Sequence, residues 1–141
     1  MRRIIFASHH RLADGLKDTF EYIAPNVADV TAVSAYLDNV PVADEIAEAL
    51  KGLDLSEDEV LVFTDLLGGS VNQAFTQYLS NPHFHVIAGM NLPAVMSVIM
   101  ALPKDGYADS DFIRTCLEDA RQQIVYVNDR FVEAAADEED E

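Results

Sequence analysis

The sequence has very little cysteine: Cys116 is the only one among 141 residues. A lone thiol cannot close an internal disulfide, and without a second cysteine there is neither a CxxC pair nor a cysteine-based metal spacing. A disulfide-stapled secreted domain is therefore excluded. We expect a protein of a reducing compartment, the cytoplasm.

Basic residues are scarce as well. The chain has 9 Lys and Arg against 25 Asp and Glu, which gives a formal net charge of −16 at pH 7. Binding to nucleic acid or to an anionic membrane depends on clustered positive charge. The charge therefore argues against both, and it predicts that the surface of a protein partner is basic.

Long apolar runs are also lacking. No stretch approaches the ~18–20 apolar residues that cross a bilayer. The apolar run behind the two N-terminal arginines covers only residues 4–7, which is too short for a signal peptide. We therefore expect no direct insertion into the membrane.

What the chain does contain is the composition of an ordinary globular protein, with 50% hydrophobic and 24% charged residues. Its length suits a single domain with one core. Residues 137–141 are all acidic, and such a run repels itself and stays solvated. We predict one domain over residues 1–132 and a disordered acidic tail over residues 133–141.

Apolar, β-branched runs alternate with segments of helical periodicity, which is typical of a parallel sheet covered by helices. We predict an α/β fold with a mainly parallel four-stranded sheet and helices on both of its faces. The expected strands are residues 3–8, 29–36, 60–65 and 83–88, and the expected helices are residues 12–23, 42–50, 71–79, a segment from Pro93 to before Pro103, and 109–123. Residues 124–127 extend the last helix or form an antiparallel edge strand, and their β-branched and aromatic side chains favour the strand.

Polar side chains gather where two of these strands end. His9 and His10 follow the first strand, and Asp65 ends the third. Reacting groups of open α/β sheets collect at the carboxyl ends of the strands, so a histidine and a carboxylate meet if the two strands are neighbours. A carboxylate bonded to one imidazole nitrogen fixes the tautomer and leaves the other nitrogen free to attack phosphorus. This pattern predicts that His9 reacts and that Asp65 orients it.

A turn of Gly68, Gly69 and Ser70 follows Asp65 and leads into the next predicted helix. We expect Ser70 to be the N-cap of that helix, and we expect the turn and the helix N-terminus to bind the phosphoryl group. Taken singly, each residue has a simpler interpretation: a solvated loop histidine, a turn-forming aspartate, a glycine turn with a cap. The adjacent His9 and His10 also suggest a metal site, but no further ligand at a familiar spacing completes one.

Three ordered motifs resemble the mannose-type IIA domains of the phosphoenolpyruvate-dependent sugar phosphotransferase system. They are residues 4–9 with the following Leu-Ala, residues 62–70 ending in Asp-Leu-Leu-Gly-Gly-Ser, and residues 86–93 with the sequence Val-Ile-Ala-Gly-Met-Asn-Leu-Pro. The resemblance implies a phosphotransferase component without a cofactor of its own. It implies that His9 accepts phosphate from an HPr-like phosphocarrier and passes it to a IIB domain, that Asp65 steadies the ring, and that Ser70 lies beside the phosphoryl group.

The resemblance also implies a homodimer in which a C-terminal strand is exchanged, a role that suits residues 124–127. The sequence departs from the family's pattern in two places, with His10 where glycine is usual and Val71-Asn72-Gln73 where Pro-Phe-Asn is frequent. Two alternatives stay open. One is the phosphocarrier subunit of a dihydroxyacetone kinase, although that family usually lacks the Gly-Gly-Ser turn. The other is a binding module whose partner depends on its phosphorylation state.

Overall fold

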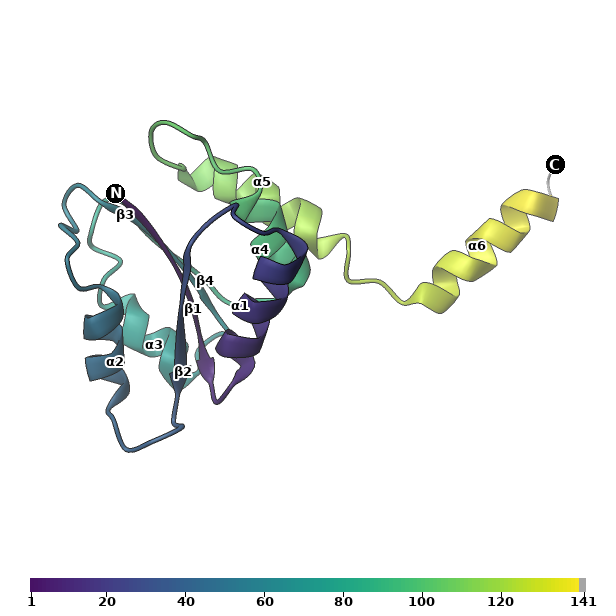
Figure 1. Ribbon diagram of the computed structural model, residues 1–141. Coiled ribbons are helices and arrows are strands. Elements are labelled where there is room, and N and C mark those ends of the chain that lie inside the picture. Colours follow the sequence, from purple (N-terminus) through teal and green to yellow (C-terminus); the bar gives the residue numbers. More distant parts are fainter. Residues whose placement is uncertain (140–141) are drawn as a thin grey trace.

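The computed structural model of the protein describes residues 1–139 and contains one four-stranded sheet (Figure 1). Its strands are β1 (Arg2–His9), β2 (Val30–Ala35), β3 (Glu59–Thr64) and β4 (Phe84–Ile87). They lie in the order β2-β1-β3-β4, and every neighbouring pair is parallel. The predicted parallel sheet is thus confirmed, and β1 and β3 are neighbours at its centre.

Helices cover both faces of the sheet, as expected (Figure 1). One face carries α1 (Leu12–Ile23), α4 (Leu92–Ile99) and α5 (Ser110–Arg121), and the other carries α2 (Val42–Ala49) and α3 (Ser70–Thr76). Two hydrophobic clusters result, one on each side. A central strand is therefore buried on both faces. All six residues of β3 are buried, and the two polar ones, Glu59 and Thr64, are its end residues.

Phe6 of β1 joins the central strands to the helix layer. Its ring meets those of Phe20 in α1 and Phe63 in β3 edge to face, with ring centroids 6.1 and 5.7 Å apart. Such pairs add to the free energy that burial of the rings already supplies. These contacts hold β1, and with it the loop that follows His9, in a fixed position relative to β3.

The first residues of α5 agree with the sequence prediction, and those of α3 do not. Asp109 caps α5, because its carboxylate accepts a hydrogen bond from the Phe112 N–H at 2.8 Å. The prediction that Ser70 caps α3 was wrong. Gly69 is the N-cap and Ser70 is the first helical residue, so the Ser70 hydroxyl is directed elsewhere.

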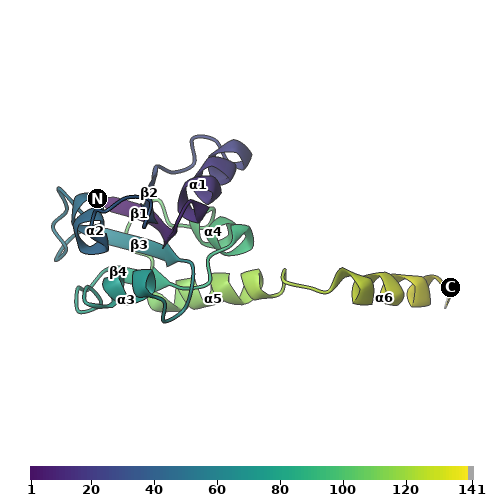
Figure 2. The same ribbon diagram turned by 90° about the horizontal axis from the view of Figure 1, so that it is seen from below.

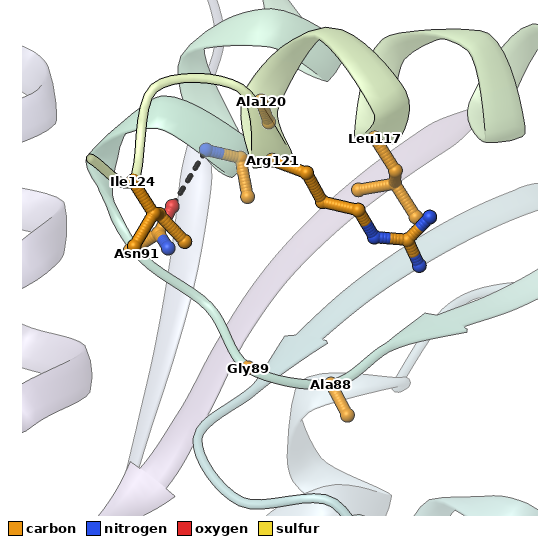
Figure 3. Close-up of a pocket in the computed structure, with 8 residues that line it drawn as sticks. Ala88, Gly89, Asn91, Leu117, Ala120, Arg121 and Ile124 are labelled. Carbon is orange, nitrogen blue, oxygen red and sulfur yellow. Dashed lines mark hydrogen bonds between the residues drawn. The ribbon is translucent and has the colours of Figure 1, made fainter. Parts of the chain in front are cut away.

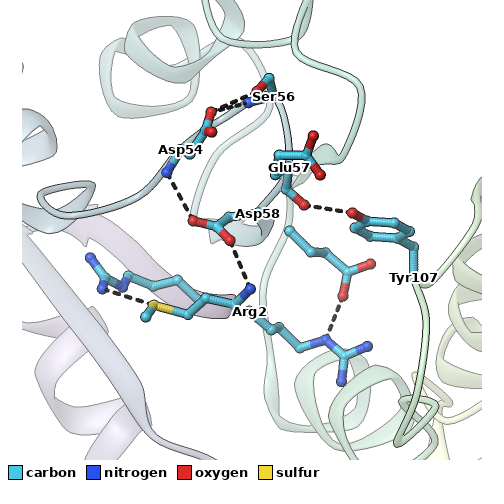
Figure 4. Close-up of polar contacts among 9 residues, drawn as sticks. Arg2, Asp54, Ser56, Glu57, Asp58 and Tyr107 are labelled. Atoms are coloured by element: carbon cyan, nitrogen blue, oxygen red, sulfur yellow. Dashed lines mark hydrogen bonds and ion pairs between the residues drawn. The ribbon is translucent and has the colours of Figure 1, made fainter.

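A polar network ties the amino ends of β1 and β3 together (Figure 4). The Arg2 guanidinium pairs with the buried Glu59 and also donates to the Pro103 carbonyl at 2.9 Å. The N-terminal amine donates to Asp58 at 2.7 Å, and the Tyr107 hydroxyl donates to the Glu57 carbonyl at 2.6 Å. All of these contacts lie at the opposite end of the sheet from His9.

The structure does not show the edge strand predicted for residues 124–127: in this single chain, residues 124–126 form neither helix nor strand, and Val127 begins a helix. These residues leave α5 beside a small hollow of about 170 Å³ lined by Ala88, Asn91 and Ile124 (Figure 3), and they lead into α6 (Val127–Glu139). They extend away from the sheet (Figure 2). A strand is stabilised by pairing with a neighbour, and in this single chain no neighbouring strand is reached.

Helix α6 covers residues 133–139 of the segment for which the sequence predicts disorder, and residues 140–141 lie outside the described residues. Alanine and glutamate have high helix propensities, which accounts for the helical backbone. An isolated helix of this length is marginal in water. The disorder of the free tail and the domain boundary at residue 132 therefore stay predictions.

Among the described residues, the helices offer no segment long and apolar enough to cross a membrane.

Candidate active site

The candidate site lies at the carboxyl ends of β1 and β3. The chain passes from β1 to β2 on one side and later to β3 on the other side of β1, so this is the topological switch point of the sheet. β1 pairs with β2 on one side and with β3 on the other, with Ala7 beside Thr64. His9 ends β1, and Asp65 directly follows β3. Loops leave such a point in opposite directions and open a crevice between them. The structure thus brings together His9, Asp65, Gly69 and Ser70.

Asp65 holds both the backbone and the ring of His9. Its Oδ2 accepts the His9 backbone N–H at 2.8 Å and lies 2.8 Å from the ring nitrogen Nδ1. Its Oδ1 accepts the Leu66 N–H at 2.9 Å. The Asp65 side chain is only 9% exposed, whereas that of His9 is 39% exposed. The carboxylate is therefore enclosed, while the imidazole reaches the surface.

The charge of Asp65 decides which nitrogen of His9 carries the proton. Burial by itself raises the pKa of Asp65, but the hydrogen bonds from the His9 backbone N–H, the His9 ring and the Leu66 N–H outweigh it, so the pKa is lowered. Asp65 is therefore an ionised carboxylate at neutral pH and can only accept. In the neutral imidazole of His9, Nδ1 therefore donates to Asp65 and Nε2 keeps a free lone pair.

This pKa shift predicts how the stability of the fold responds to acid. Because the pKa of Asp65 is lower in the folded than in the unfolded chain, its contribution to the free energy of unfolding is complete above the ordinary value of about 4. It is lost as the pH falls through the folded pKa. Urea unfolding of the wild type and of Asp65→Asn should show a stability difference that shrinks as the pH is lowered.

Comparing the wild type with Asp65→Asn cancels the contributions of other acid-sensitive groups to the stability difference. The pKa of Asp58 is also lowered, chiefly by its hydrogen bond from the N-terminal amine, and that effect is present in both proteins. A stability difference that stays constant between neutral pH and about pH 3 would contradict the assignment.

The Gly-Gly-Ser turn lies directly against the His9 ring. A Cβ placed on Gly69 would be 3.2 Å from the Leu66 Cβ and 3.5 Å from Cε1 of His9. Gly68 has φ +75°, a backbone conformation that L side chains rarely adopt. The Gly68 N–H donates to Asn72 Oδ1 at 3.1 Å and the Gly69 N–H to the Leu66 carbonyl at 3.1 Å. The two glycines thus shape the turn, and their amides are engaged within it.

Ser70 presents its hydroxyl to the other side of the imidazole. Its Oγ lies 3.2 Å from Nε2 of His9, the nitrogen that keeps the lone pair. The ring is therefore contacted at both nitrogens, by Asp65 at Nδ1 and by Ser70 at Nε2.

His10 takes no part in these contacts. It is exposed, and within residues 1–139 its imidazole makes no hydrogen bond. Its backbone has φ +55°, which explains why glycine suits this position in the family that the sequence resembles. Its N–H donates to the Ala35 carbonyl at 2.8 Å and so ties the loop after β1 to the end of β2.

Sequence reasoning missed two contributors to the site. Asn72 is buried, donates to Thr64 Oγ1 at 2.9 Å and accepts from Gly68, so it fixes the turn to the end of β3. Tyr36 follows β2, its hydroxyl lies 2.7 Å from Ser70 Oγ, and its ring centroid is 5.4 Å from that of His9. Tyr36 directly follows β2, and its place at a strand end was the signal available in the sequence, whereas Asn72 lies in the first turn of α3 beyond the Gly-Gly-Ser turn.

The arrangement provides an oriented nucleophile at a surface. No group of three or more His, Cys, Asp or Glu side chains in the described part of the chain is placed to hold a metal ion. The chemistry open to these residues is attack by Nε2 on an electrophile brought by another molecule, with hydrogen-bond donors beside the incoming group.

Comparisons with known proteins show the family to which the chain belongs. The sequence model of the EIIA-man family, described as the PTS system fructose IIA component, matches residues 3–113. A crystal structure described as a phosphoenolpyruvate-dependent sugar phosphotransferase system (PTS) permease from Klebsiella pneumoniae is 32% identical, with a TM-score of 0.83 over 92% of this chain and 93% of that one. No curated protein matches the sequence.

Two further solved structures share the fold at lower identity. Component EIIA from Streptococcus agalactiae is 22% identical with a TM-score of 0.75, covering 91% of this chain and 98% of that one. The mannose/sorbose-specific IIA subunit from Enterococcus faecalis is 20% identical with a TM-score of 0.74, covering 89% and 93%. The family match and the 32% identical relative show that the chain belongs to the mannose-type IIA family of the phosphotransferase system.

Proposed function

We propose that the chain is a phosphoryl carrier, in which Nε2 of His9 accepts phosphate from an HPr-like phosphocarrier protein and passes it to a IIB domain. The observation that carries the proposal is the 2.8 Å contact between Asp65 Oδ2 and Nδ1 of His9, because it leaves Nε2 as the free nucleophile. Asp65 orients the ring, and the turn of Gly68, Gly69 and Ser70 receives the phosphoryl group. Because the Gly68 and Gly69 amides are engaged within the turn, the Ser70 hydroxyl is the donor to that group. Catalysis is positional and needs no cofactor.

The surroundings of His9 support a protein as the phosphoryl donor. Exposed apolar side chains follow the two strands that carry His9 and Asp65: Leu12 begins α1 and is 53% exposed, and Leu66 and Leu67 follow β3 and are 61% and 86% exposed. A cluster of this kind is typical of a surface that another protein covers. The net charge of −16 favours a basic partner surface and accelerates the encounter with it.

The proposal is tested by incubating the protein with phosphoenolpyruvate, Enzyme I and HPr and then measuring its intact mass. We expect one acid-labile phosphate per chain, and we expect that phosphate to move to a IIB domain added afterwards. A chain that takes up no phosphate contradicts the proposal. A chain that takes up phosphate but gives none to any IIB domain supports instead the phosphorylation-dependent binding module.

We further infer that two copies associate through residues 124–127. In the single chain these residues expose large apolar side chains, with Ile124 at 69%, Tyr126 at 66% and Val127 at 68%. A short segment outside the helices that carries β-branched and aromatic side chains is suited to pair as an added strand. The strand that is absent in one chain thus forms only when a second copy supplies its neighbour.

Sedimentation equilibrium should therefore give the mass of a dimer for the wild type and of a monomer for the double variant Ile124→Asp, Tyr126→Asp. Two charged side chains in a desolvated contact oppose association. Tyr22→Asp is the matched control, because Tyr22 is 87% exposed on α1 and should leave the dimer intact. A monomeric wild type contradicts the inference.

A further inference from the structure

Tyr36 has a backbone conformation that the core of the protein does not explain. Its φ is +68°, in the left-handed region that large side chains rarely enter. Its side chain is 50% exposed, so burial in a hydrophobic cluster does not hold it there. Such conformations persist where the surroundings impose them, and they are concentrated at functional sites.

The contacts of Tyr36 are all directed at the candidate site. Its ring lies beside the His9 ring, with centroids 5.4 Å apart and planes at 36°. Its hydroxyl lies 2.7 Å from Ser70 Oγ, which in turn lies 3.2 Å from Nε2 of His9. The residue before it, Ala35, accepts the His10 N–H at 2.8 Å, which anchors the Tyr36 loop to the loop that carries His9.

The direction of each hydrogen bond in this chain follows from Asp65. The ionised carboxylate accepts, so Nδ1 of His9 carries the ring proton and Nε2 is an acceptor. Ser70 must then donate its only hydroxyl hydrogen to Nε2. With that hydrogen committed, Ser70 Oγ can only accept from Tyr36. The hydrogens therefore point one way, from Tyr36 to Ser70 and from Ser70 to His9.

We propose that Tyr36 is a positioning residue for the phosphoryl group on His9, acting through Ser70: by donating to Ser70 Oγ, it keeps the Ser70 hydrogen directed at Nε2 in the free protein and at a phosphoryl oxygen in the phosphorylated one. This inference rests on the proposed function. The hydrogen of a free hydroxyl can rotate among several acceptors. When Tyr36 donates to Ser70 Oγ, rotation of the Ser70 hydroxyl would break that bond, so its hydrogen stays directed at one acceptor.

The transfer step balances without an additional reactant. The lone pair of Nε2 forms the new N–P bond while the N–P bond of the donor phosphohistidine breaks, and the donor imidazole keeps the electron pair of the broken bond. The Ser70 hydrogen stays covalently bound to Oγ and only changes its acceptor from Nε2 to a phosphoryl oxygen. Tyr36 continues to donate to Ser70 throughout, so no proton is gained or lost at the site.

The test measures the rate of phosphate acceptance from phosphorylated HPr in Tyr36→Phe, in Ser70→Ala and in the double variant. Tyr36→Phe keeps the ring beside His9 and removes only the hydroxyl. We expect acceptance to slow by about five- to tenfold in each single variant, which is the effect of one lost hydrogen bond. Because Tyr36 acts through Ser70, the double variant should be no slower than Ser70→Ala alone. Tyr22→Phe is the matched control, because the Tyr22 side chain is exposed on α1, and this variant should accept phosphate at the wild-type rate.

A second measurement needs no phosphate. In the unphosphorylated protein, the ¹⁵N chemical shift of Nε2 reports the hydrogen bond from Ser70. We expect this shift to move in the same direction in Tyr36→Phe and in Ser70→Ala, and to be unchanged in Tyr22→Phe. An unmoved shift in Tyr36→Phe overturns the inference, because the hydroxyl then does not orient Ser70.

The outcomes separate this inference from the proposed function. A wild type that accepts phosphate, with Tyr36→Phe equally fast, overturns the role of Tyr36 and leaves the carrier function standing. Multiplying effects in the double variant also overturn it, because Tyr36 then acts independently of Ser70. A wild type that accepts no phosphate overturns the carrier function and the phosphoryl role of Tyr36 together, whatever the chemical shifts show.

Discussion

Replacement of His9 by alanine is expected to abolish phosphorylation of the chain by phosphoenolpyruvate, Enzyme I and HPr. Nε2 of His9 is the nitrogen whose lone pair Asp65 leaves free, and alanine offers no nucleophile in its place. The measurement is intact mass at neutral pH, followed by acid treatment to release phosphate bound to nitrogen. We expect the wild type to carry one such phosphate and His9→Ala to carry none.

The neighbouring histidine supplies the control, and its backbone decides which variant to use. His10 has φ +55°, so alanine at this position would be strained by roughly 1–2 kcal/mol. Asparagine tolerates this conformation better, which makes His10→Asn the cleaner substitution. His10→Asn should retain the phosphate. If it loses the phosphate while His9→Ala retains it, the acceptor is His10 and the assignment of the site is wrong.

Asp65→Asn is expected to slow phosphate acceptance by about two orders of magnitude while leaving the protein folded. Asp65 accepts from three N–H groups: two belong to His9 and one to Leu66. Asparagine has only one oxygen. If its amide nitrogen faces His9, it donates to Nδ1 and moves the ring proton to Nε2, which removes the nucleophilic lone pair. If the amide nitrogen faces Leu66, two donors confront each other.

Stopped-flow or quenched measurement of the acceptance rate checks this expectation, and circular dichroism checks that the variant is folded. Asp18→Asn is a suitable control, since Asp18 is exposed on α1 and should accept at the wild-type rate. An Asp65→Asn rate within about twofold of the wild type would mean that orientation of the ring contributes little to the reaction.

The elements that could be predicted from the sequence are those that show a clear spacing of apolar residues within one short segment. β3 was recognised because residues 60–63 form a continuous apolar run, and α1 because its apolar residues recur at helical spacing. The meeting of His9 and Asp65 was predicted only on the condition that β1 and β3 are neighbours. Strand order depends on contacts distant in sequence, so only the structure supplied that condition.

The errors and omissions share a physical cause. Ser70 looks like a helix cap because its hydroxyl can satisfy a backbone N–H. In the structure, His9 at the end of β1 and Tyr36 after β2 contact that hydroxyl instead. Tyr36 was missed because a left-handed tyrosine cannot be recognised from residue type alone. Residues 124–127 have the composition of a strand, but composition does not say whether a partner edge is available.

The polar network around Arg2 and Glu59 lies at one end of the sheet, and His9 lies at the other. Substitutions of the exposed Leu12, Leu66 and Leu67 at the His9 end therefore leave the buried ion pair and its neighbours untouched. Over evolutionary time, such a separation lets the phosphate-handling rim diversify toward new partner proteins while the scaffold beneath it keeps its folding free energy.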